Sequence, residues 1–66
     1  MNTDAIRGKM AENRVSQREL AFKMGISLQS LNRKLLGKRG FTVEEASNMC
    51  NILKIPMQER AEIFLT

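Results

Sequence analysis

Basic side chains dominate the chemistry that this sequence offers, and they gather in its first two thirds. Between residues 7 and 39, nine lysines and arginines accompany only two glutamates, whereas the segment from residue 40 onward carries two basic and four acidic residues. The net charge of the 66-residue chain is +4. Lysines and arginines often do no more than solvate helix faces, but their uneven distribution here favours a polyanionic partner such as nucleic acid.

Residues suited to catalysis or metal binding are scarce. The chain has no histidine, and Cys50 is its only cysteine, so it offers neither an internal disulfide nor a zinc constellation. It also lacks a glycine-rich phosphate loop and any pairing of a nucleophile with a base. We therefore predict that the protein is not an enzyme and binds no metal or cofactor. With no signal peptide and no long apolar run, it is expected to be soluble and cytoplasmic.

Short helices must position the basic side chains. Residues 4–13 place Ile6 and Met10 on one helix face. Two capping boxes, at residues 16–19 and 42–45, predict one helix that begins near Gln17 and another that runs over residues 43–53. Between them, a serine cap and a terminal glycine delimit a helix over about residues 28–36, and Pro56 suits the first turn of a final helix.

The second and third predicted helices are joined by a very short turn. Ala21 is small enough for close crossing, Gly25 permits a sharp turn, and Ile26 and Leu31 are apolar positions that can be buried. We predict a single all-α domain over residues 1–66, a compact bundle of about five short helices that contains a helix-turn-helix.

The stretch SQRELAFKMGISLQSLNRKLLGKR, residues 16–39, resembles the helix-turn-helix of the XRE superfamily, which includes phage lambda-type repressors and Cro-type proteins. The family's S-Q-x-E-L-A start, its glycine-isoleucine-serine turn and its S-L-x-R-x-L-x-G-K ending are all present. The resemblance implies a lambda-repressor-like fold and a transcriptional regulator that binds double-stranded DNA sequence-specifically. It also implies that the helix of residues 28–36 enters the major groove. The protein is expected to act in the cytoplasm of a bacterial host cell.

The resemblance further implies roles for individual residues. Gln29 and Arg33 lie about 40° apart on a helical wheel and are expected to read base edges. Asn32 is a third reader or a phosphate contact. The expected phosphate contacts are Gln17, Ser27, Ser30, Lys34, Lys38 and Arg39.

Two leucines depart from the family pattern, which usually has polar residues at their positions. Leu28 is expected either to contact a thymine methyl group as a fourth base reader or to pack in the core. Leu36 is expected to pack against the helix of residues 43–53.

Two questions stay open at the level of sequence. The same fold serves as a protein-binding module in antitoxins or adaptors, which is the alternative to DNA binding, and another phage regulator is a conceivable protein partner. Regulators of this type commonly act as homodimers on palindromic operators, at least on DNA. Met57, Ile63, Phe64 and Leu65 are expected either to make that dimer contact or to close the core. The chain is also compatible with a fragment of a longer regulator.

Overall fold

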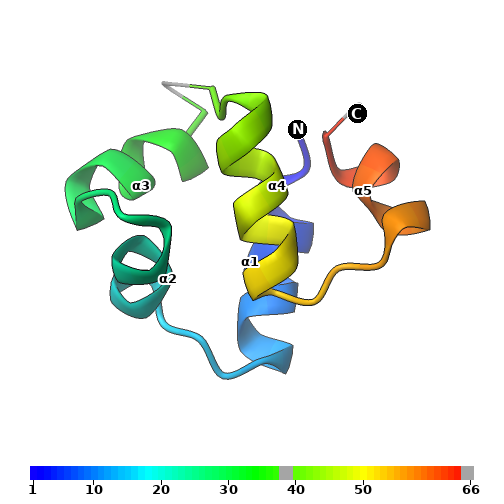
Figure 1. Cartoon of the computed structure of the whole chain (residues 1–66), viewed down its shortest axis with the longest axis horizontal. Coiled ribbons are helices and arrows are strands. Elements are labelled where there is room, and N and C mark those ends of the chain that lie inside the picture. Colours follow the sequence, from blue (N-terminus) through cyan, green and yellow to red (C-terminus); the bar gives the residue numbers. More distant parts are fainter. Residues whose placement is uncertain (38–39, 65–66) are drawn as a thin grey trace.

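The computed structural model describes residues 1–37 and 40–64, which form five helices and no strand (Figure 1). The helices are α1 (Thr3–Glu12), α2 (Gln17–Met24), α3 (Leu28–Leu35), α4 (Val43–Ile52) and α5 (Met57–Phe64). The predicted all-α, five-helix fold is therefore confirmed. The predicted helices over 28–36 and 43–53 each end one residue earlier, because Leu36 and Leu53 serve as C-caps.

Side-chain caps begin the helices that the sequence delimited most clearly. The hydroxyl oxygens of Ser16, Ser27 and Thr42 each accept a hydrogen bond from the backbone N–H three residues on, at 3.0–3.1 Å. At α4 the capping box is complete, because the Glu45 carboxylate also accepts from the Thr42 backbone N–H at 3.0 Å. At α2 the Glu19 carboxylate instead lies 3.7 Å from the Lys23 ammonium.

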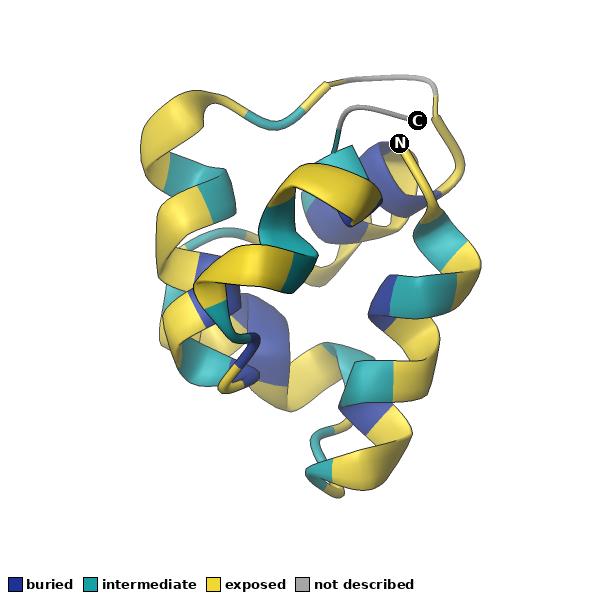
Figure 2. Cartoon of the chain, turned by 90° about the vertical axis from the view of Figure 1, so that its right-hand side faces the viewer, coloured by how far each residue is buried: buried dark blue, intermediate teal, exposed yellow. Residues whose placement is uncertain are grey.

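One apolar core fills the space between the helices. Figure 2 shows buried segments of the helices between exposed and intermediate ones, and in α1 and α3 the buried residues recur three or four positions apart. α2 packs against both α3 and α4, and α1 packs against α5. The buried apolar residues are Ile6, Met10, Leu20, Ala21, Leu31, Leu35, Met49, Cys50, Leu53, Ile55 and Ile63. No helix of the described ranges is long and apolar enough to cross a membrane.

The turn between α2 and α3 has the conformation that its glycine allows. Gly25 adopts φ +73°, a left-handed conformation that side chains disfavour, and its backbone N–H bonds back to carbonyls of α2. Ile26, which follows, packs against the core. The short turn therefore brings the start of α3 beside α2.

Contacts among the described residues join α1 and its flanking residues to the C-terminal third of the chain. The Asn2 backbone N–H donates to the Ile63 carbonyl at 2.7 Å, and the Lys9 ammonium pairs with Glu59 at 3.0 Å. The Asn13 amide donates to the Leu53 carbonyl at 2.8 Å. α1 is thereby anchored both to α5 and to the end of α4.

Candidate nucleic-acid interface

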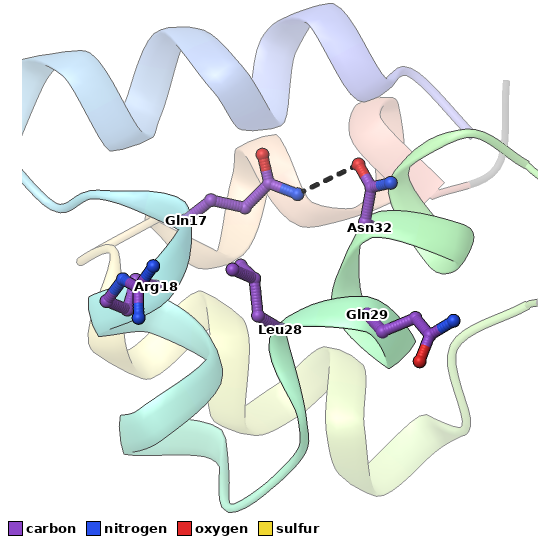
Figure 3. Close-up of a pocket in the computed structure, with 5 residues that line it drawn as sticks. All are labelled: Gln17, Arg18, Leu28, Gln29 and Asn32. Carbon is purple, nitrogen blue, oxygen red and sulfur yellow. Dashed lines mark hydrogen bonds between the residues drawn. The ribbon is translucent and has the colours of Figure 1, made fainter.

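The start of α2 and the outer face of α3 converge on an open hollow at the surface. Gln17 and Arg18 line it from α2, and Leu28, Gln29 and Asn32 line it from α3 (Figure 3). Four of these five residues belong to the predicted DNA contacts. The structure thus brings together predicted base readers and a predicted phosphate contact.

Helical periodicity explains why α3 presents these side chains. Leu31 and Leu35 are four residues apart and fully buried, which fixes one face of the helix to the core. Gln29, Asn32 and Arg33 consequently lie on the exposed face. This polar face at the end of a short turn is free to approach a partner.

Leu28 lies at the boundary between the two faces. Its side chain is 39% exposed and lines the hollow, so the expectation that it packs in the core is wrong. The expectation that Leu36 packs against α4 is wrong as well. Leu36 is 57% exposed because, next to the buried Leu35, it lies about 100° further round the helix axis.

The Gln17 and Asn32 side chains are joined across the hollow. The Gln17 amide nitrogen Nε2 donates to the Asn32 oxygen Oδ1 at 3.2 Å, a contact between α2 and α3 drawn as a dashed line in Figure 3. The Gln29 amide points away from both (Figure 3).

Two predicted phosphate contacts lie at the start of α3. The Ser27 hydroxyl is exposed and accepts from the Ser30 backbone N–H, which leaves its own O–H hydrogen free for a further bond. Ser30 is half-buried. Lys38 and Arg39 lie outside the described residues.

Lys34 does not fit its predicted phosphate role. Its side chain turns inward and is only 7% exposed. The ammonium lies 2.9 Å from the Glu45 carboxylate and 3.1 Å from the Gly40 carbonyl, and 5.6 Å from the ring centre of Phe41. The Thr42 backbone N–H and then this ammonium lower the pKa of the Glu45 carboxyl. Lys34 therefore joins α3 to α4, and we remove it from the set of phosphate contacts.

The apolar residues near the C-terminus divide between interior and surface. Ile63 is buried in its own chain, and Phe64 packs edge to face on Phe41 with ring centres 6.4 Å apart. These two residues close the core, which is the alternative left open by the sequence. Met57 is 74% exposed, and Leu65 lies outside the described residues.

Sequence reasoning did not single out Arg18 as a candidate site residue, although it included Arg18 among the nine basic residues between residues 7 and 39. Arg18 is exposed and lines the hollow beside Gln17. Its position in the first turn of α2, directly after a predicted phosphate contact, was the available signal.

The described residues contain no cluster of three or more histidine, cysteine, aspartate or glutamate side chains that could hold a metal ion. Cys50 is buried, and burial raises the pKa of its thiol. The thiol is therefore packed as an apolar group rather than poised as a nucleophile.

A comparison of the sequence with models of known protein families also identifies a helix-turn-helix. A family model described as helix-turn-helix covers residues 6–60, which include α2, α3, α4 and most of α1. No curated protein and no solved structure gave a match.

Proposed function

We propose that this chain, which belongs to the XRE-type helix-turn-helix family of DNA-binding domains, is a transcriptional regulator of the phage repressor or Cro type. It binds a double-stranded DNA operator, with α3 in the major groove. The observation that carries the proposal is the exposed polar face formed by Gln29, Asn32 and Arg33, beside the start of α2.

Each outward side chain has chemistry suited to a base edge. The Arg33 guanidinium matches the O6 and N7 acceptors of guanine, and the Gln29 amide matches the N6 donor and N7 acceptor of adenine. The exposed methyl groups of Leu28 match the C5-methyl group of thymine.

Phosphate contacts supply affinity without sequence information. We assign this role to Ser27, Ser30 and Gln17, and to Lys38 and Arg39. Arg18 joins them because its guanidinium is exposed beside Gln17. A homodimer on a palindromic operator would place two copies of α3 about 34 Å apart. Among the candidate dimer contacts that the structure describes, Met57 is then the most exposed.

Selection of bound sites from a random duplex pool tests the proposal. The wild type should enrich a palindromic motif, and Arg33→Ala should lose discrimination at one position of each half-site by about 1–3 kcal/mol. Arg7→Ala, which removes an exposed arginine from α1, serves as the matched control and should retain the motif.

Two results would contradict the proposal. Salt-sensitive binding without an enriched motif would favour the protein-binding alternative, with DNA attracted only by charge. An equal loss for all sequences on Arg33→Ala would remove the base-reading role of that residue.

A further inference from the structure

The hydrogen bond between Gln17 and Asn32 constrains more than the distance between two helices. An asparagine side chain carries one acceptor oxygen and one NH₂ group with two donors. The Asn32 oxygen already accepts from the Gln17 Nε2 at 3.2 Å, and the Asn32 nitrogen points away from Gln17 (Figure 3). In this arrangement Asn32 presents donors to an approaching partner.

Leu28 explains why the two amides meet. Its side chain rises from the start of α3 into the same hollow and offers no hydrogen-bonding group (Figure 3). Leu28 therefore offers the Gln17 amide no acceptor, and the amide instead reaches Asn32, one turn further along the helix. Gln29 is different, because its amide points away and keeps both its oxygen and its nitrogen for a base edge.

We propose that Gln17 is a specificity-determining positioning residue: it holds the Asn32 amide so that the NH₂ group donates to an acceptor on a base edge. The inference rests on the proposed function, and it changes the role of Gln17 from a sequence-independent phosphate contact to a determinant of sequence. Because its oxygen is turned toward Gln17, Asn32 presents its NH₂ group and selects a base-edge acceptor, such as guanine O6 or N7 or thymine O4, rather than forming the bidentate pair with adenine N6 and N7.

Site selection with Gln17→Ala, Asn32→Ala and the double variant tests this proposal. Gln17→Ala should relax base preference at the same motif position as Asn32→Ala, by about tenfold, and the double variant should be no worse than Asn32→Ala alone. If Gln17 acted only on a phosphate, Gln17→Ala would weaken binding uniformly across sequences and add to the Asn32→Ala effect. That result would overturn the proposal.

A reversal of amide polarity gives a second test. A glutamate at position 17 can only accept, so Asn32 must turn its nitrogen inward and present its oxygen. Gln17→Glu should therefore shift the preference at this one position toward a base that carries a donor, adenine or cytosine. Gln58→Glu, which makes the same change of charge at an exposed position of α5, should leave the preference unchanged. An unchanged preference in Gln17→Glu would contradict the inference.

The failure of this inference is distinguishable from that of the proposed function. If the wild type enriches a motif but Gln17→Ala acts uniformly, only the positioning role is wrong. If the wild type enriches no motif, the proposed function fails, and the positioning role fails with it.

Discussion

Polar contacts join α3 to its neighbours on both faces of the helix, and the contacts on the two faces differ in almost every physical respect. On the inner face the Lys34 ammonium meets the Glu45 carboxylate at 2.9 Å in a largely buried setting. On the outer face two neutral amides meet at 3.2 Å near solvent. A buried ion pair is strongly destabilising when one partner is removed, whereas an exposed amide contact competes with water and contributes little to stability. The inner contact therefore holds the helix in place, and the outer one orients a side chain.

The largest expected effect breaks the inner contact. Lys34→Met should lower the free energy of unfolding by about 2 kcal/mol, because it leaves the half-buried Glu45 carboxylate without its cation. For a domain of this size the melting temperature should fall by about 10 °C.

Two variants control this experiment. Lys34→Met combined with Glu45→Gln should recover part of the loss, because glutamine preserves the capping box without a buried charge. Lys23→Met, which breaks the half-exposed 3.7 Å pair with Glu19, should cost less than about 0.5 kcal/mol. Equal losses in Lys34→Met and Lys23→Met would remove the distinction between the two faces.

A smaller effect tests the apolar part of the outer face. Replacement of the thymine that we propose Leu28 contacts by deoxyuridine removes one methyl group, and wild-type binding should weaken about fourfold. Leu28→Ala should bind both duplexes alike. Titration of labelled duplexes measures both affinities. If Leu28→Ala lost as much affinity as the wild type on replacement of thymine by deoxyuridine, the thymine methyl group would contact a residue other than Leu28.

Acidification should weaken the inner contact without affecting the outer one. Because the pKa of Glu45 lies below its ordinary value near 4.5, the unfolded chain takes up a proton there more readily than the folded one. The stability from this carboxylate is fully present above the ordinary pKa and is lost as the pH falls through the lowered one. The melting temperatures of the wild type and of Glu45→Gln should converge as the pH falls from about 6 to about 3, a range that includes the ordinary pKa of a glutamate. A constant difference would show that Glu45 does not titrate in this way.

The smallest expected effect belongs to the outer contact. Gln17→Ala and Asn32→Ala should each change the free energy of unfolding by no more than about 0.5 kcal/mol, since both side chains lie at the surface. Denaturant titration of the purified variants measures this. A loss as large as that of Lys34→Met would mean that the outer contact also holds the helix in place.

Local signals in the sequence predicted much of this fold. The caps at Ser16, Ser27 and Thr42 and the left-handed Gly25 depend on residues within one turn, so their spacing was sufficient. The spacing of Leu31 and Leu35 likewise predicted which face of α3 is buried.

The surroundings of Lys34 depend on the tertiary structure and were not predictable in this way. The Gly40 carbonyl, the Phe41 ring and the Glu45 carboxylate come from the following loop and from α4, and only the packing of these elements brings them to the ammonium. A wheel of α3 alone cannot distinguish an inward lysine with such partners from an outward one. The bond between Gln17 and Asn32 escaped prediction for the same reason, because it joins two helices whose relative placement the sequence does not state.

The contacts that join α1 to the end of the chain also bear on the order of folding. The Asn13 amide reaches a carbonyl forty residues away, and the Asn2 backbone bonds near the end of α5. Closing such long loops loses chain entropy before the contacts compensate for it, whereas α2 and α3 meet across a turn of a few residues. The half of the molecule that contains α2 and α3, which we propose faces DNA, is therefore expected to assemble early. The contacts of α1 with α5 and with the end of α4 are expected to form late and to open first.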